Sequence, residues 1–134
     1  MLCVPATPLA TEAARKVLPA QIPHADAAAN AARAALLVTA LTSQPGLLMD
    51  ATEDFLHQRY RAAAMPASAS LIAALRAAGI PAVVSGAGPS VLAFAIAGSG
   101  PAAADVAAVA APGAWGTWQV LPLRLDTRGG HVIP

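Results

Sequence analysis

The sequence has one cysteine, few aromatic residues and few charges. Cys3 alone cannot form an intramolecular disulfide or a cysteine-based zinc site, so both are excluded. Charged residues make up 11% of the chain, well below the roughly 25% of an average soluble domain. The formal net charge is only +1, which excludes a basic surface for nucleic acid. The lone thiol is compatible with a reducing compartment, and we expect a cytoplasmic protein.

No uninterrupted apolar segment of membrane-spanning length is present. An uncharged stretch extends from Ile80 to Ala104, but proline and glycine break it throughout, at Pro81, Gly86, Gly88, Pro89, Gly98, Gly100 and Pro101. A single spanning helix could not keep its backbone hydrogen bonds across so many breaks. The N-terminus also lacks a basic segment followed by an apolar block. We therefore predict neither a membrane span nor a secretory signal.

Alanine, by contrast, is abundant, at 37 of 134 residues, so much of the apolar content is in small side chains. The length fits one domain, which we expect over residues 1–123, with 124–134 as a tail. Periodicity predicts helices over 9–18, 23–42, 47–61, 66–78 and 102–111, and strands over 2–5, 82–84, 91–96 and 115–121. The 47–61 helix could begin with a separate short piece. This order predicts an α+β fold with helices packed on one face of a mainly antiparallel sheet.

The first candidate site is the loop between two predicted strands, Ser85 to Ser90. Its two glycines permit positive φ, so successive backbone N–H groups could converge on an oxyanion. It is not a P-loop, because no Gly-Lys-Ser/Thr follows. It is not a dinucleotide fingerprint either, because Val91 stands in place of the third glycine and a strand follows. The alternative is an ordinary hairpin turn.

Two further candidates depend on helical spacing. Thr11 and Arg15 are one turn apart, so their hydroxyl and guanidinium could bind a carboxylate or a phosphate. The alternative is that Thr11 caps the helix and Arg15 is solvated. Asp54, His57 and Arg61 share one face of the predicted 47–61 helix, which would orient Arg61 as an anion anchor. The alternative is a network of side chains on a solvated face.

Other polar residues give no catalytic or metal-binding pattern. His24 and His131 have no partners at ligand spacing. Asp26 is either a general base or, as we favour, a cap at the start of its helix. Ser85 and Ser90 lack a neighbouring histidine and acid that could activate a nucleophile. We therefore expect no catalytic residue and no metal ligand within this chain.

Several segments together resemble the homoserine kinases, a branch of the GHMP small-molecule kinases. The segments are Leu9 to Arg15, Ala25 to Leu37, Ala51 to Arg61 and Ile80 to Val91. The last of them looks like the third, C-terminal glycine-rich motif of the GHMP family. The Thr11/Arg15 block and the Tyr60-Arg61 block favour the homoserine branch. The resemblance extends over about residues 4 to 119.

The resemblance implies a fold like the GHMP kinase C-terminal domain and a role for each matched position. Thr11 and Arg15 would line the amino-acid acceptor site, and Arg61 would hold the substrate carboxylate. The glycine-rich loop, which consists of Ser85, Gly86, Ala87, Gly88, Pro89 and Ser90, would lie against the phosphate-binding loop of another domain. The implied reaction is ATP-dependent phosphorylation of the L-homoserine hydroxyl in threonine biosynthesis, with ATP and Mg²⁺ as cofactors.

Parts of the family pattern are absent from the sequence. The main nucleotide loop, of the type Pro-x-x-x-Gly-Leu-Gly-Ser-Ser, and the Mg²⁺-binding carboxylate of the first domain are missing, and Ala10 replaces a usual serine. The strand predicted at Leu2 has no earlier strand to pair with. We therefore expect a C-terminal fragment of a homoserine kinase, inactive alone, whose partner is the missing N-terminal half. The sequence leaves a homodimer open.

Other functions remain open at this point. One is a non-catalytic regulatory module that uses Arg15 and Arg61 to bind an amino acid. Another is a fragment of a different small-molecule GHMP kinase, because the glycine-rich loop alone indicates only the family. The last is an unstable remnant without function, since loss of a partner domain would expose apolar surface.

Overall fold

The computed structural model describes residues 1–96, 98, 100–111, 116–124, 129–130 and 132. In chain order the elements are β1 (Leu2–Pro5), α1 (Thr11–Lys16), α2 (His24–Thr42), η1 (Pro45–Leu47), α3 (Leu48–Ala51), α4 (Gln58–Arg61), η2 (Ala62–Ala64), α5 (Pro66–Ala77), β2 (Ala82–Val84), β3 (Val91–Ala93), α6 (Ala103–Val109) and β4 (Trp118–Leu121). His131 and much of the predicted tail over 124–134 lie outside the described residues.

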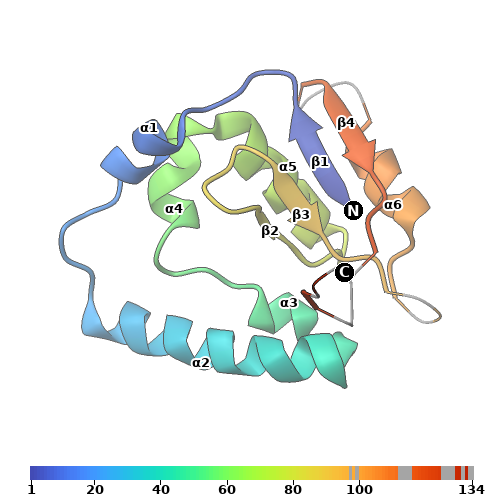
Figure 1. The fold of residues 1–134 in the computed structure, drawn as a ribbon, viewed down its shortest axis with the longest axis horizontal. Helices are drawn as coiled ribbons and strands as arrows, with labels where there is room; N and C mark the ends of the chain where they lie inside the picture. Colours follow the sequence, from blue (N-terminus) through green and yellow to red (C-terminus); the bar gives the residue numbers. More distant parts are fainter. Residues whose placement is uncertain (97, 99, 112–115, 125–128, 131, 133–134) are drawn as a thin grey trace.

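The four strands form one antiparallel sheet in the order β2-β3-β1-β4. With α5 between β1 and β2, and α6 between β3 and β4, this is the β-α-β-β-α-β pattern of ferredoxin-like folds. Cys3 of β1 lies opposite Val91 on one side and Val120 on the other. The first strand therefore finds both neighbours within the chain (Figure 1). Our inference of a missing strand partner before Leu2 was wrong.

The main core lies between the sheet and two helices. Helices α5 and α6 pack on the same face, as Figure 1 shows behind the strands. Leu71 and Leu75 of α5 and Val106 of α6 are fully buried against Cys3 and Val91 of the sheet. Each large apolar side chain buried in this way contributes roughly 1.5–3 kcal/mol. The predicted α+β layer, with helices on one face of an antiparallel sheet, is confirmed.

Helix α2 lies outside this layer, along the lower edge of the molecule in Figure 1. Only Ala40 of its residues is buried, in a small cluster with Leu48 and Ala51 of α3, against which Phe94 also packs. Phe94 follows Ala93, whose side chain lies in the main core, so Phe94 points to the opposite face of the sheet. The second cluster therefore packs against the end of β3, on the side away from α5 and α6.

The region over 47–61 does not form the one helix that we predicted. Instead, α3 ends when the Thr52 hydroxyl donates to the Leu48 carbonyl at 2.6 Å, and a turn separates it from α4. The Asp54 carboxylate accepts the N–H groups of three residues in that turn, which are Leu56, His57 and Gln58. Short polar side chains that bond the local backbone compete with a continuous helix. Asp54 therefore starts α4 rather than lying on a long helical face.

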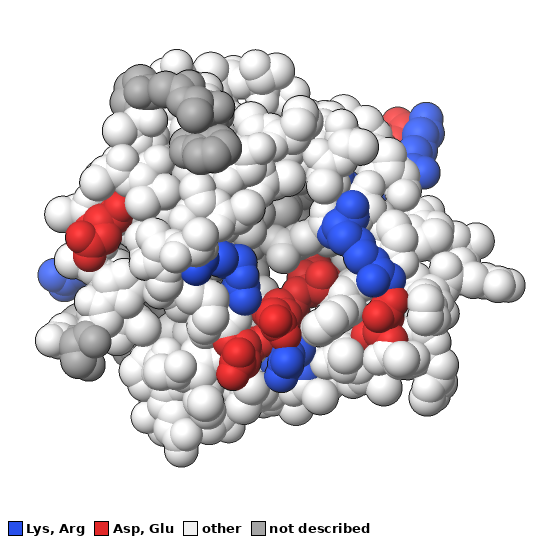
Figure 2. Space-filling view, turned by 180° about the vertical axis from the view of Figure 1, so that it is seen from behind, with Lys and Arg blue, Asp and Glu red and all other residues white. Residues whose placement is uncertain are grey.

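The charged side chains on the face in Figure 2 do not gather into a patch of one charge sign. Figure 2 shows basic and acidic side chains next to one another on a mostly uncharged face. The ion pairs include Arg33 with Glu53, at 2.7 Å, and Lys16 with Glu12, at 2.9 Å. None of the helices in the described part of the chain is both long enough and apolar enough to span a membrane.

Candidate functional site

Arg61 is the most buried charged side chain of the predicted site. It is 8% exposed, and its Nε donates to the Ala14 carbonyl of α1 at 3.1 Å. Its Nη1 donates to the Gly86 carbonyl of the glycine-rich loop at 3.2 Å. These bonds use two of the five N–H donors of a guanidinium, which leaves the others for a ligand. Arg61, on α4, therefore bonds both α1 and the glycine-rich loop at the point where the three meet.

A cavity of about 360 Å³ forms at that point. Its lining combines two arginines, an acid and histidine pair, and the loop; the residues are Arg15, Asp54, His57, Arg61, Val84, Gly86 and Ala87. Figure 1 shows the loop between β2 and β3 reaching from the sheet toward α4 and α1. The structure thus brings together Arg15, Arg61 and part of the loop, which are more than 20 residues apart in the sequence. Their roles toward a ligand stay predictions.

The charges around the cavity favour an anion. Arg15 is exposed, and within the described residues its guanidinium has no ion pair or hydrogen bond. The Asp54 carboxylate is already held by backbone N–H groups, and its Oδ1 lies 3.3 Å from Nδ1 of His57. Two guanidinium groups therefore face one carboxylate that has other partners. A planar carboxylate or a phosphate is the ligand that such guanidinium groups bind best.

Thr11 does not cap α1, which was the alternative interpretation of its role. Ala10 occupies the N-cap of α1, so Thr11 is the first residue of the helix and not its cap. The threonine is exposed and is not among the residues that line the cavity. Arg15, one turn further on, does line it. Of the predicted pair, only the arginine faces the other candidate residues.

The glycine-rich loop is a tight hairpin turn with its own hydrogen bonds. Ser85 N–H donates to the Ser90 carbonyl at 2.8 Å, and Gly88 N–H donates to the Ser85 carbonyl at 3.0 Å. Those two N–H groups are therefore engaged inside the loop, and the loop residues that line the cavity are Gly86 and Ala87. The hairpin alternative is thus correct as geometry, and it leaves a short segment available to a ligand.

Two separate features favour glycine at position 88. Its φ is +84°, a region that residues with a Cβ rarely adopt. A Cβ there would also lie 2.7 Å from Sδ of Met65, which is buried at the end of η2. Gly86 has a φ of +62° but nothing within 4 Å of a Cβ. The loop therefore packs tightly through Gly88 and is open at Gly86.

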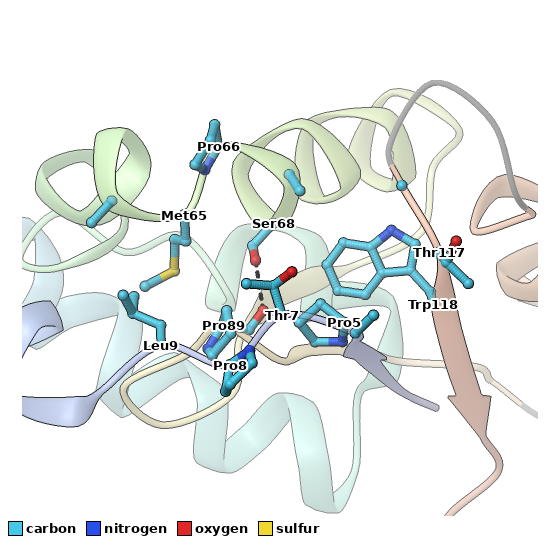
Figure 3. A pocket seen from close by; sticks show the side chains of 14 residues that line it. Pro5, Thr7, Pro8, Leu9, Met65, Pro66, Ser68, Pro89, Thr117 and Trp118 are labelled. Atoms are coloured by element: carbon cyan, nitrogen blue, oxygen red, sulfur yellow. Dashed lines mark hydrogen bonds between the residues drawn. The ribbon is translucent and has the colours of Figure 1, made fainter.

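A second cavity of about 360 Å³ is lined in part by Pro89 (Figure 3). Its walls come from the segment between β1 and α1, the start of α5, and β4 at Trp118. The Ser68 hydroxyl donates to the Pro89 carbonyl at 2.6 Å along one wall. Among the described residues, no charged side chain lines this cavity. We therefore assign the anion to the first cavity.

Sequence reasoning missed Gln58 as part of the site. Its Oε1 accepts the N–H of Val84, at the end of β2, at a distance of 2.7 Å. This bond holds the start of the glycine-rich loop against α4. Gln58 stands within the segment that carries the family resemblance, but no spacing rule distinguishes it there. The only signal is its position three residues before Arg61.

Asp26 takes part in a structural cluster and does not cap α2. Pro23 occupies the N-cap, and Asp26 forms an ion pair with Arg59 of α4. The Arg59 guanidinium also donates to the Tyr60 hydroxyl at 2.6 Å and lies 4.7 Å from the centre of its ring. Hydrogen bonds to Tyr60 and to Asp26 raise the pKa of Arg59, which keeps it cationic. The cluster fixes the start of α2 to α4.

The described residues do not provide a metal site of their own. No three side chains of His, Cys, Asp or Glu gather as ligands among them. Among the described residues, Asp54 supplies the one carboxylate that lines the cavity, and backbone donors engage it. Mg²⁺ therefore does not fit the residues that this part of the chain places at the cavity.

Comparison with known proteins identifies the class first. The family described as GHMP kinases C terminal matches residues 37–114, which is more than half of the chain. The chain therefore belongs to the GHMP kinase C-terminal family. Arg61 and the glycine-rich loop lie inside the matched region, and Arg15 lies before it.

The particular relatives are homoserine kinases. The chain is 56% identical over 131 residues to "Homoserine kinase" from Streptomyces avermitilis, covering 98% of this chain and 41% of that protein. The Streptomyces coelicolor enzyme is 53% identical, with 98% and 40% covered. The crystal structure of homoserine kinase from Cytophaga hutchinsonii aligns with a TM-score of 0.63 and 28% identity, over 69% of this chain and 30% of that one. The chain thus spans about two fifths of the length of the curated relatives, and the expected resemblance to homoserine kinases is confirmed.

Proposed function

We propose that this chain is the acceptor-binding part of an ATP-dependent homoserine kinase. Such an enzyme phosphorylates the side-chain hydroxyl of L-homoserine in threonine biosynthesis, a cytoplasmic route. The observation that carries the proposal is the cavity in which Arg15 and Arg61 face the tip of the glycine-rich loop. The relatives named homoserine kinase support this choice over another GHMP kinase.

The proposal includes an orientation for the substrate. The substrate carboxylate binds the free guanidinium of Arg15 and the remaining donors of Arg61. The hydroxyl end then points toward the backbone of Gly86 and Ala87, where the phosphoryl group would arrive. Phosphoryl transfer depends mainly on positioning and on charge stabilisation. In this scheme the chain supplies the position of the acceptor.

The nucleotide has no site among the residues described. We assign ATP and Mg²⁺ to the part of the homoserine kinases that this chain does not match. There, ATP would supply the phosphoryl group and Mg²⁺ would neutralise the charge that develops on it. The chain on its own is therefore expected to show no kinase turnover, and an N-terminal kinase half is its expected partner.

A chimera tests the proposal. The matched region of the Streptomyces avermitilis enzyme is replaced by this chain, and ADP release is measured with L-homoserine and Mg-ATP. We expect turnover from the chimera and none above the blank from the chain alone. In the active chimera, Arg61→Ala raises the KM for homoserine, because it removes carboxylate donors. A folded chimera without turnover, or turnover by the isolated chain, would contradict the proposal.

A further inference from the structure

The glycine-rich loop is held along its length by one segment, Gln58 to Ser68, which contains α4, η2 and the start of α5. The Gln58 amide oxygen accepts from Val84 N–H at the incoming end of the loop, at 2.7 Å. Arg61 donates to the Gly86 carbonyl at the tip, and the Ser68 hydroxyl donates to the Pro89 carbonyl near the outgoing end. The segment that carries the carboxylate-binding Arg61 therefore also fixes the loop.

The bond from Gln58 meets a specific need of the sheet. Strand β2 is at the edge of the sheet, with β3 on one side only. Ser85 N–H bonds the Ser90 carbonyl, and Phe94 N–H bonds the Pro81 carbonyl, so the hydrogen-bonded positions of β2 are the odd-numbered residues. Val84 N–H therefore points away from β3. The Gln58 side chain supplies the partner that the ladder does not.

Gln58 is not among the residues that line the cavity, so it would act on a ligand only through the loop. It lies one helical turn before Arg61, on the same short helix α4. Its bond to Val84 thus fixes the separation between the guanidinium that holds the carboxylate and the loop that faces the hydroxyl. A misplacement of about 1 Å between reacting groups can reduce a rate by about a hundredfold.

We propose that Gln58 is a positioning residue for phosphoryl transfer, holding the glycine-rich loop at a fixed distance from the acceptor carboxylate. This inference rests on the proposed function. Loss of the Gln58 bond should lower kcat and have little effect on substrate affinity, because Arg15 and Arg61 would still bind the carboxylate. A residue needed only for folding would lower the amount of active enzyme, and with it the apparent kcat, at an unchanged KM. The kcat is therefore calculated per folded enzyme, and on that basis such a residue would show no loss.

The test compares three variants of the active chimera. Gln58→Met removes the acceptor oxygen at similar length, Gln58→Glu keeps an acceptor oxygen, and Gln21→Met makes the same change at an exposed glutamine. We expect Gln58→Met to lower kcat about tenfold while the KM for homoserine changes less than about threefold. Gln58→Glu should stay within about threefold of the parent kcat, and Gln21→Met should match the parent. An unchanged kcat in Gln58→Met, or equal losses in both Gln58 variants, would overturn the proposal.

A second measurement on the 134-residue chain separates the two proposals. Gln58→Met should speed amide hydrogen exchange at Ser85 and Gly88 about tenfold, while Ala93 of β3 keeps its rate. If Gln58→Met does not fold, Ser68→Ala removes the other end contact with little volume change and should give the same selective effects. A parent chimera without turnover would contradict the proposed function alone. Unchanged loop exchange in a folded variant would overturn the positioning role.

Discussion

The two arginines of the cavity differ in kind. Arg61 is buried and donates to two backbone carbonyls, so it is part of the framework as well as a proposed ligand-binding group. Arg15 is exposed and is available for a ligand. The neighbouring Lys16 forms an ion pair with Glu12, at 2.9 Å, and does not line the cavity. Adjacent cations on one short helix therefore serve different purposes.

Cys3 gives a residue-scale prediction about pH. The side chain is fully buried on the central strand, and burial raises the pKa of the thiol more than the N-terminal charge lowers it. Below the unfolded pKa, about 8.5, both states hold the proton and stability is full. As pH rises above it, the unfolded chain loses the proton first, so stability falls until the folded pKa is passed.

Urea unfolding between about pH 7 and pH 10 checks this prediction. The wild-type chain should lose stability more steeply over that interval than Cys3→Ala, in which no thiol ionises. The alanine variant serves as the control for all other groups, including the N-terminal amine that donates to the Ala93 carbonyl. Parallel pH curves for the two proteins would contradict the assignment.

At the scale of elements, the turn before α4 controls how the site is assembled. The helical spacing of Asp54, His57 and Arg61 predicted that they share one face of a single helix. This prediction was wrong, because the chain leaves the helix and turns between Thr52 and His57. The three residues nevertheless line one cavity, since the Asp54 carboxylate folds the turn back onto the start of α4. Periodicity describes one regular element, and it cannot show such a side-chain-directed break.

Removing the Asp54 carboxylate should therefore weaken α4. Asp54→Ala leaves the N–H groups of Leu56 and His57 without their acceptor, and we expect a loss of about 1–2 kcal/mol in the free energy of unfolding. Asp54→Asn keeps one acceptor oxygen and should lose less than half as much. Denaturant unfolding of both variants measures the difference. Equal stability of the alanine variant and the wild type would exclude the capping role.

The loop makes a second element-scale prediction through its two glycines. Gly86→Ala meets open space and should cost about 1–2 kcal/mol for the positive φ alone. Gly88→Ala adds a collision with Met65, and we expect a total of about 2–5 kcal/mol. Thermal unfolding of the two variants gives the comparison. A Gly88 variant as stable as the Gly86 variant would show that Met65 moves away without cost.

At the scale of the whole molecule, the sequence predicted most of the architecture. The apolar period of α5 at Leu71 and Leu75 and the β-rich runs around the glycine-rich loop indicated the α+β layer correctly. The partners of β1 could not be predicted, because pairing with β3 and β4 joins segments about 90 and 117 residues apart. The role of Gln58 was equally hidden, since it depends on which backbone donor the sheet edge leaves unpaired.

The candidate site followed from resemblance more than from spacing. Helical spacing paired Thr11 with Arg15, but only Arg15 lines the cavity. The meeting of Arg15, Arg61 and the loop requires the turn at Asp54 and the return of the chain through α5 and β2. No local pattern encodes that path. The central claim is that the two guanidinium groups bind the carboxylate of the acceptor.

The most direct test of this claim combines a variant pair with a substrate pair. In the active chimera, kcat/KM is measured for L-homoserine and for 3-amino-1-propanol, which is homoserine with the carboxylate replaced by hydrogen. Arg15→Met should lower kcat/KM for homoserine by about 10–100-fold and leave that for aminopropanol unchanged, because a charged hydrogen bond to the carboxylate is lost. The matched control Lys16→Met should change neither value. Equal losses on both substrates, or no loss on homoserine, would contradict the claim.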